Sequence, residues 1–314
     1  MGVEVFQMHS NDELTSQYLD YLKLEREASP CTLENYGYDI RHFVNFVVPK
    51  NLLETTMSDV RRYVSFLKLT KGLANTSINR KLISLRSMFS FFVSIEVVSQ
   101  NPFVAFNYIG IRRKKPLSLK SNQLIHIMNH LDSECRIADE SGDELKRFVA
   151  FRNRLMIKIM ILSGFRRSEV ITLKRSSLVK SDSSWAFSIM SRTPDNTRIV
   201  PVHSGIYSNL IEYLKMHRGI SDFLFVQSKT GRPLSVDTLY LIFKDIRAAI
   251  PGLSRIMPKS LRHTFASRLA ANGESLRTIQ DLMGHKKIET TQIYIHVPDK
   301  TRAQAVNRLT LALQ

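Results

Sequence analysis

Apolar residues recur every three or four positions in four segments of the first hundred residues. This period is typical of amphipathic helices that bury one face. Pro30 stands at the start of the second segment and Asn101-Pro102 follows the fourth, as expected at helix ends. Four helices are therefore predicted. Their apolar stripes are Leu14, Tyr18, Tyr21 and Leu22; Leu33, Tyr36, Ile40, Phe43, Val44 and Val47; Val60, Val64 and Leu67; and Ile78, Leu82, Leu85, Phe89 and Phe92.

The second part of the chain begins with a short polar stretch and continues with further helical periods. A long amphipathic helix is predicted from about Phe148 to Leu162, with Gly164 as its stop signal. Gly273 and Gly284 are predicted to end two later helices. The apolar stripes of this later region are Leu239, Ile242, Phe243 and Ile246, and Leu261, Phe265 and Leu269.

One stretch alternates with the period of a β-strand. Trp185, Phe187 and Ile189 are separated by smaller or polar residues, as in a half-buried strand. Residues 193–196 have the composition of a turn with proline at its second position, and residues 198–202 form the predicted return strand. The predicted fold class is therefore mainly α with a small antiparallel β-sheet.

Charge divides the chain unevenly. The 314 residues contain 45 Lys and Arg against 28 Asp and Glu, which gives a net charge of +17. Residues 1–114 contribute +3 of this charge and residues 115–314 contribute +14. A polyanionic partner is expected of so basic a chain.

A basic stretch bounded by Gly110 and Pro116 separates the two parts. We predict a helical domain over residues 1–108, a linker over 109–116 and a second domain over 117–314. The linker residues Arg112, Arg113 and Lys114 could lie along phosphates, or they form an ordinary solvated charge run.

The fourth predicted helix has basic residues beside its apolar stripe. Arg80, Lys81 and Arg86 lie off that stripe and could face a DNA groove. The alternative is a merely solvated helix face, and the pattern does not decide between the two.

The remaining composition excludes several classes of protein. Cys31 and Cys135 are too few for a disulfide framework or a cysteine zinc site. No run of residues approaches the roughly 20 apolar positions of a membrane span, and no signal-peptide pattern is present. We expect a cytoplasmic protein associated with the nucleoid, without contact with a membrane.

Three short motifs in the second part place polar side chains where an apolar pattern does not require them. They are Ser163-Gly164-Phe165-Arg166-Arg167-Ser168-Glu169-Val170, Pro258-Lys259-Ser260-Leu261-Arg262-His263-Thr264-Phe265, and Leu282-Met283-Gly284-His285-Lys286-Lys287-Ile288 followed by Tyr294.

These motifs, in this order and near the carboxyl end, resemble those of the tyrosine recombinase or integrase family, which includes the Xer-type and phage-integrase-like enzymes. The resemblance spans essentially the whole chain. It implies a helical core-binding domain followed by an α+β catalytic domain. It also implies a site-specific recombinase that cleaves and rejoins DNA through a 3′-phosphotyrosyl intermediate, without a cofactor or metal.

The resemblance gives each motif residue a role. It makes Arg166 and Arg262 the arginine pair, Glu169 their acidic supporter, His285 the histidine of the third motif and Tyr294 the nucleophile. The chemistry is consistent with these roles, because planar guanidinium groups match the two nonbridging oxygens of a phosphodiester and stay charged at neutral pH. A phenol near such cations can form a covalent phosphotyrosine that conserves the energy of the broken bond.

Each residue also has a plainer interpretation. Arg166 and Glu169 could be a surface i,i+3 pair, and His285 could be a buried structural histidine. Tyr294 competes with other tyrosines and is favoured by its spacing from His285. A zinc site at His263, His285 and His296 is disfavoured because their spacing is wrong for one.

The chain departs from the family at two positions. Lys259 occupies the place of the usual histidine of the second motif, and Thr193 occupies the place of the usual hairpin lysine, which acts as general acid. The neighbouring Arg192 could approach DNA but is a poor proton donor. We hypothesise that Lys259 supplies the missing proton function; the alternative is a weakened active site.

Recombination by this family implies four protomers on two DNA duplexes. The tail from Val297 to Gln314 is predicted to form a short helix that docks onto a neighbouring protomer, although it could also pack on its own domain. A sequence-specific DNA-binding protein with weakened catalysis and a type IB topoisomerase-like enzyme are the competing functions. The recognition sequence and the phage, transposon or chromosomal context stay open.

Overall fold

The computed structural model describes residues 10–111, 116–181, 184–190, 197–217, 221–285 and 287–294. The chain divides into two compact units at positions 114/115, within the stretch predicted as a linker. The predicted turn at 193–196 and the predicted tail helix at 297–314 lie outside the described residues.

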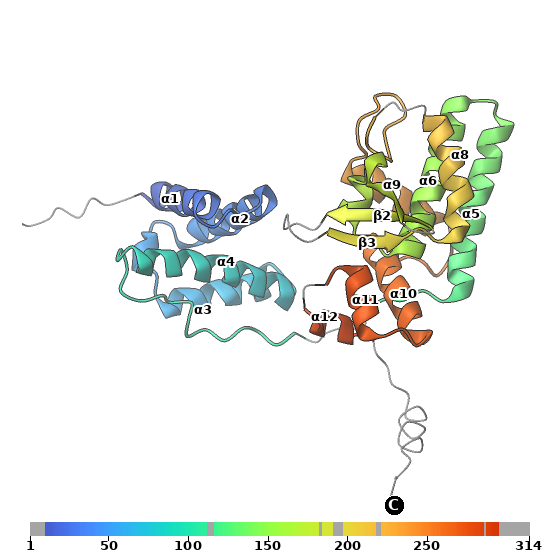
Figure 1. Cartoon of the computed structure of the whole chain (residues 1–314). Coiled ribbons are helices and arrows are strands. Elements are labelled where there is room, and N and C mark those ends of the chain that lie inside the picture. The colour runs from blue at the N-terminus through green and yellow to red at the C-terminus, as the bar shows by residue number, and fades with distance from the viewer. Residues whose placement is uncertain are drawn as a thin grey trace, which may run out of the picture. The chain divides into compact units, whose positions relative to one another are not determined.

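The first unit is helical, and four α-helices lie at the four predicted stripes (Figure 1). Ser10 begins the first of them with a capping box: its hydroxyl accepts from the Glu13 N–H, and the Glu13 carboxylate accepts from the Ser10 N–H. Pro30 begins the second, where its fixed φ suits the first helical turn. The elements are α1 (Asn11–Leu24), α2 (Pro30–Val47), the 3₁₀ turn η1 (Leu52–Glu54), α3 (Met57–Ser65), the π-helical turn η2 (Phe66–Thr70) and α4 (Asn75–Ser94).

Aromatic rings fill the centre of this unit, where α2 packs against α1, α3 and α4. Phe43 lies edge-on to Tyr63 at 4.9 Å between ring centroids and to Phe103 at 5.6 Å, and all three rings are buried. Such edge-to-face pairs add to the free energy gained by burying apolar area.

Two asparagines of α4 extend the packed part of the first unit beyond its helices. The side chain of Asn79 donates to the Ile109 carbonyl at 2.8 Å and accepts from the Ile109 N–H at 3.0 Å. Asn75 donates to the Gly110 carbonyl at 2.9 Å. The chain is therefore held by α4 as far as residue 110.

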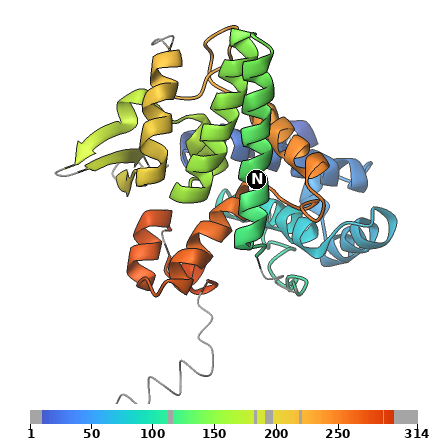
Figure 2. The same cartoon turned by 90° about the vertical axis from the view of Figure 1, so that its right-hand side faces the viewer.

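The second unit is built around one central helix, α6 (Glu144–Ser163), which packs against three other helices of the unit, α5, α8 and α10 (Figure 2). This is the long helix predicted from the sequence, and it ends before Gly164 as expected. The elements of the second unit are α5 (Ser121–Glu140), α6 (Glu144–Ser163), α7 (Arg167–Ile171), η3 (Arg175–Ser177), β1 (Leu178–Ser181), β2 (Ser184–Met190), β3 (Thr197–Pro201), α8 (Ser204–His217), α9 (Val236–Ala249), α10 (Pro258–Ala271), α11 (Leu276–Met283) and α12 (Glu289–Gln292).

The predicted hairpin is present as β2 and β3, which pair antiparallel with Phe187 opposite Val200. A third strand, β1, was not predicted; it pairs antiparallel with β2 on the other side, so the sheet order is β1-β2-β3. Four residues are too few to show a period of two, and only pairing with β2 defines this strand.

Within the described residues, no helix is long and apolar enough to cross a membrane.

Candidate functional site: an arginine cluster beside a buried tyrosine

The site begins where α6 ends, at Gly164. Gly164 has φ +62, and a Cβ at this position would lie 2.3 Å from the ring of Phe265. Only glycine fits this turn without strain. The turn places Arg166 at the start of α7, and the Gly164 carbonyl accepts a hydrogen bond from Arg262 Nη1 at 2.7 Å.

Three arginines from three elements surround one carboxylate, that of Glu169 on α7. Arg198 of β3 donates to both of its oxygens, at 2.8 and 2.7 Å. Arg166 donates to Oε1 at 2.6 Å through Nη1 and to Oε2 at 2.7 Å through its backbone N–H. Arg262 of α10 lies 3.9 Å from Oε2. The cluster therefore holds three guanidinium charges against one carboxylate charge.

The carboxyl end of α11 fixes the same three arginines from the other side. Arg198 Nε donates to the Leu282 carbonyl at 3.0 Å, and Arg262 Nη2 donates to the Met283 carbonyl. Arg166 Nη2 donates to the Gly284 carbonyl at 2.7 Å. The last carbonyls of a helix lack intrahelical partners and form the negative end of its dipole, so guanidinium groups are favoured there.

Burial and charge perturb both partners of this cluster. Burial alone would raise the pKa of the Glu169 carboxyl, but the hydrogen bonds and charge of Arg198, together with Arg166, outweigh burial and lower it to about 2. Burial, together with the neighbouring charge of Arg166, lowers the pKa of Arg262 to about 10. Both groups are ionised at neutral pH, and the surplus positive charge can attract an anion.

Tyr294 lies buried beside this cluster, two residues after the end of α12. Its hydroxyl is 2.5 Å from Nδ1 of His263, a residue of α10 that follows Arg262. Burial raises the pKa of the Tyr294 phenol, and the charge of Arg262 opposes this increase. The sequence motifs thus come together in space, with Arg262 acting electrostatically on the tyrosine.

His285 lies on another side of the same tyrosine. Its ring is nearly parallel to the Tyr294 ring, at 12° and 6.4 Å between centroids. Its Nδ1 is 2.9 Å from Thr291 Oγ1. Burial, followed by the charges of Arg262 and Arg166, lowers the pKa of His285 to about 4.

Lys259 is exposed in the first turn of α10, directly after Pro258. It lies one helical turn before His263, and its charge contributes to lowering the pKa of that histidine. Lys259 is therefore on the same face of α10 as the buried site but open to solvent.

The basic residues predicted on the fourth helix are placed differently from the expectation. Lys81 is only 4% exposed, so it does not lie on a solvated helix face, which was one of the two interpretations of the sequence pattern. Lys81 and Arg80 both bond Asp39 of α2, and Arg86 donates to the carbonyls of Phe103, Val104 and Phe106. The buried carboxylate of Asp39 attracts Lys81 into the unit, whereas Arg80 reaches the same carboxylate and stays exposed, and stripe analysis does not reveal this carboxylate. Arg192, Arg112, Arg113 and Lys114 lie outside the described residues.

Two residues of the site were not recognised as such in the sequence. Arg198 precedes the buried Val200 by two positions, so the strand period places both on the inward face, and a charged residue there is a usable signal. No role at the tyrosine was predicted for His263 from the sequence, and only the fold shows that it faces Tyr294.

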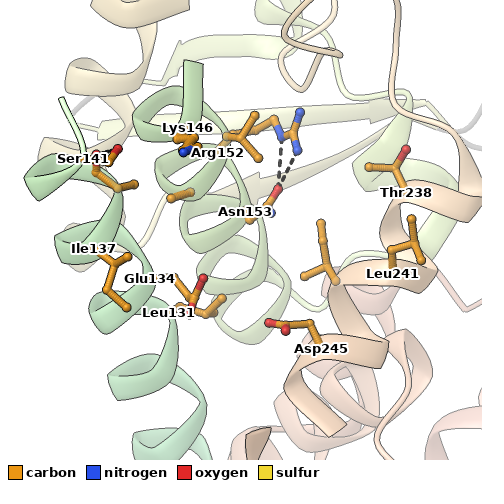
Figure 3. Close-up of a pocket in the computed structure, with 14 residues that line it drawn as sticks. Leu131, Glu134, Ile137, Ser141, Lys146, Arg152, Asn153, Thr238, Leu241 and Asp245 are labelled. Carbon is orange, nitrogen blue, oxygen red and sulfur yellow. Dashed lines mark hydrogen bonds between the residues drawn. The ribbon is translucent and has the colours of Figure 1, made fainter. Parts of the chain in front are cut away.

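The part of the chain that the structure describes contains no candidate metal cluster beside this arrangement. No group of three His, Cys, Asp or Glu among those residues is placed to hold a metal ion. A cavity of about 520 Å³ lies between α5, α6 and α9 (Figure 3), and Arg152 on its wall bonds Asn153 and the Val226 carbonyl. None of its lining residues belongs to the arginine cluster.

A helical unit followed by a unit with a small sheet, and three arginines gathered on one carboxylate beside a buried tyrosine, match the class that the motifs resemble, enzymes that break and rejoin DNA strands. Comparison with known proteins identifies the family. Residues 118–301 match the phage integrase family, and residues 15–95 match its N-terminal SAM-like domain. The chain belongs to the phage integrase family of tyrosine recombinases and is a tyrosine site-specific recombinase.

Relatives along the whole chain agree. Tyrosine recombinase XerC of Halalkalibacterium halodurans is 30% identical over 313 residues, covering 95% of this chain and 97% of that protein. Tyrosine recombinase XerC of Bacillus pumilus is 27% identical over 301 residues, covering 92% and 93%. These relatives do not favour a sequence-specific DNA-binding protein with weakened catalysis or a type IB topoisomerase-like enzyme.

Solved structures share the fold. XerH recombinase bound to its difH substrate aligns with a TM-score of 0.70 at 24% identity, covering 94% of this chain and 84% of that one. The Tn1549 transposon integrase in complex with a circular intermediate DNA aligns with a TM-score of 0.73 at 19% identity, covering 96% and 99%. The predicted two-domain fold class is confirmed.

Proposed function

We propose that Tyr294 attacks a DNA phosphodiester held by Arg166 and Arg262, and that strands are exchanged between two paired sites on double-stranded DNA. The observation that supports this most directly is the convergence of three arginines on Glu169 beside the Tyr294 hydroxyl. Glu169 orients the guanidinium groups, and its single negative charge leaves two positive charges uncompensated for the phosphate.

Arg166 is the member of the cluster best placed to reach a phosphate from solvent. Its side chain is 37% exposed, against 9% for Arg262 and 10% for Arg198. We assign Arg198 to positioning, since it donates to Glu169 and the Leu282 carbonyl through Nη1, Nη2 and Nε. The nearby His285 is assigned to a nonbridging phosphate oxygen.

The nucleophile is tested with a nicked DNA substrate that traps the covalent product. Wild-type protein should form an adduct that resists SDS, and Tyr294→Phe should form none, because a phenyl ring has no oxygen to bond phosphorus. Tyr240→Phe is the matched control, because Tyr240 lies exposed on α9 and should retain the full rate. Adduct formation by Tyr294→Phe would place the nucleophile elsewhere.

Lys259 is proposed to protonate the leaving 5′ oxygen, in place of the hairpin lysine that the family has where Thr193 stands. A substrate with sulfur at the leaving position needs no such proton, because thiols have a pKa near 8.5. Lys259→Ala should therefore slow cleavage of the oxygen substrate by roughly 10²- to 10⁴-fold and leave cleavage of the sulfur substrate near the wild-type rate. Equal rates for Lys259→Ala and wild type on the oxygen substrate would reject this role.

We further propose a tetramer on two duplexes, in which residues 297–314 of each protomer dock onto a neighbour. The supporting pattern is the apolar series Ala303, Val306, Leu309, Leu311 and Leu313. Deletion from Arg302 onward should preserve binding to one site and abolish pairing of two sites, measured by gel mobility and by recombinant yield. Normal recombination by the truncated protein would contradict the docking.

DNA is expected to contact both units and the basic residues between them. Substitution of Arg112, Arg113 and Lys114 by Ala should reduce the slope of log affinity against log salt by about 2.7, if each of the three neutralises one phosphate. An unchanged slope would show that these residues are merely solvated. Contact of Arg192, Arg80, Lys81 and Arg86 with DNA stays a prediction; Lys81 would first have to leave Asp39.

A further inference from the structure

We propose that the imidazole of His263 takes the proton of Tyr294 when the phosphotyrosine bond forms, and returns it when the strand is rejoined. This inference rests on the proposed role of Tyr294 as nucleophile. It goes beyond that role by naming the group that accepts the proton, to which no residue has been assigned above.

The first argument is contact with the reacting atom. Nδ1 of His263 lies 2.5 Å from the Tyr294 hydroxyl oxygen, within the distance at which a base can accept a proton directly. His263 and Tyr294 are 8% and 9% exposed, so bulk water competes little for this hydrogen bond. His263 follows Arg262 in the sequence, so one helix positions both the phosphate clamp and the base.

The second argument comes from the other groups near the hydroxyl. His285 presents its ring face to Tyr294, and its Nδ1 contacts Thr291. Lys259 is exposed, and a lysine ammonium has three N–H donors and no acceptor, so it suits donation of a proton rather than acceptance. The geometry thus separates a proton acceptor at His263 from a proton donor at Lys259.

Electrostatics keeps His263 in the accepting form. Burial, followed by the charges of Lys259 and Arg262, lowers its pKa to about 4, so it is neutral at pH 7. A phosphate bound to Arg166 and Arg262 brings negative charge that offsets these cations. The basicity of His263 is therefore expected to rise only when the DNA backbone is in place, which couples activation of Tyr294 to substrate binding.

The proton and bond changes balance without another reactant. The Tyr294 oxygen forms a bond to phosphorus while its proton moves to Nδ1 of His263. The bond from phosphorus to the 5′ oxygen breaks, and that oxygen receives a proton from Lys259. In rejoining, a 5′ hydroxyl attacks phosphorus, its proton returns to Lys259, and Nδ1–H of His263 donates to the departing tyrosine oxygen.

The test measures single-turnover adduct formation on the oxygen and sulfur substrates. In His263→Asn, the amide can still bond the Tyr294 hydroxyl but cannot accept its proton at neutral pH. We expect roughly 10²- to 10⁴-fold slower cleavage by this variant on both substrates. Sulfur at the leaving position removes the requirement for a proton donor, but Tyr294 still has to lose its proton. His130→Asn is the matched control, because His130 lies on α5 and pairs with Asp245 away from the cluster.

A second variant guards against a purely structural effect. His263→Ala opens space beside Tyr294, and added imidazoles should restore cleavage more strongly as their basicity increases, which a packing defect would not produce. Rates for His263→Asn within threefold of wild type, or full recovery on the sulfur substrate, would overturn the inference. Loss of the adduct in Tyr294→Phe with normal rates in His263→Asn would reject only the base; an adduct in Tyr294→Phe would reject the nucleophile itself.

Discussion

Two carboxylates that are little exposed to solvent, Asp39 in the first unit and Glu169 in the second, each pair with several cations, and these two clusters are built for different ends. Asp39 on α2 accepts from Arg80 at 2.5 and 2.8 Å, from Lys81 at 2.9 Å and from Ser84 at 2.8 Å. All four residues belong to two neighbouring helices, α2 and α4. The Asp39 cluster therefore joins two helices of one bundle.

The Glu169 cluster instead gathers arginines from a loop, a strand and a helix that are far apart in the sequence. Arg166, Arg198 and Arg262 also donate to the carbonyls at the end of α11. Each arginine is thus held by at least two hydrogen-bond acceptors. Three guanidinium charges against one carboxylate leave two positive charges uncompensated near Tyr294. A carboxylate with two cations fixes a fold, whereas a carboxylate with three arginines also preorganises a site for an anion.

The largest expected effect comes from removing each carboxylate charge. Asp39→Asn and Glu169→Gln should each lower the free energy of unfolding of their own unit by about 3 to 5 kcal/mol, because buried cations lose their partner. Trp185, the one tryptophan of the chain, lies on β2 and reports the second unit by fluorescence, while circular dichroism reports both units. The urea concentration at the midpoint of unfolding, followed by Trp185 fluorescence, should therefore decrease for Glu169→Gln and stay at the wild-type value for Asp39→Asn.

The same pair of variants separates structure from chemistry. Under conditions where both variants are folded, Asp39→Asn should cleave a trapped substrate at the wild-type rate, whereas Glu169→Gln should be slower. If Asp39→Asn slowed cleavage as much as Glu169→Gln does, the contrast between the two clusters would be lost.

Removal of Arg166 should affect chemistry more than stability. Its side chain is 37% exposed, so solvent screens its ion pair with Glu169 and little stability should be lost. Removing one donor to a developing oxyanion slows a reaction by roughly 10²- to 10³-fold, and we expect this loss of adduct formation in Arg166→Ala. A large drop in the unfolding midpoint, with a near-normal rate in the folded fraction, would contradict the assignment.

Acid should weaken the second unit over a defined range of pH. The folded pKa of Glu169, about 2, lies below its ordinary value of 4.5, so its contribution is complete above pH 4.5 and is lost as pH falls toward 2. By pH 3 the loss should reach about 2 kcal/mol. His263 and His285, with pKa values lowered to about 4, lose their contribution earlier, between about pH 6.5 and 4.

Urea unfolding monitored by Trp185 between pH 7 and pH 3 checks this prediction. The difference between wild type and Glu169→Gln isolates the carboxylate, and it should shrink below pH 4.5 while staying constant above that value. A difference that is constant down to pH 3 would mean that Glu169 is not held ionised by the arginines.

The elements that could be predicted from the sequence are those whose signal lies within one short segment of the chain. The four helices of the first unit, the long α6 and the β2-β3 hairpin each have a period that can be counted, and Gly164 and Gly284 end helices in the left-handed region as expected. The β1 strand was missed because its existence depends on pairing with β2 rather than on its own pattern.

The site shows the same limit. The motifs indicated candidate catalytic residues, but not which partner each side chain would take. Lys81 is attracted inward by Asp39, 42 positions away, and His263 meets a tyrosine 31 positions further on. Such pairings depend on how helices pack, and no spacing along the chain encodes them.

The smallest expected effect compares two glycines that end helices. Gly273 and Gly284 have φ of +87 and +61, so alanine at either position should cost about 1 kcal/mol of stability. A Cβ at Gly273 meets nothing within 4 Å, whereas a Cβ at Gly284 lies 3.0 Å from the side chain of Arg198. Arg198 must then shift by a few tenths of an ångström, and Glu169 with it.

Only Gly284→Ala should therefore slow adduct formation. A full ångström of misplacement slows catalysis by roughly 10²-fold, so a smaller shift should slow it by about fivefold, while Gly273→Ala keeps the wild-type rate. Single-turnover rates of the two variants, compared at matched folded fractions, measure this difference. Equal rates would indicate that Arg198 moves freely and that the end of α11 does not position the arginines.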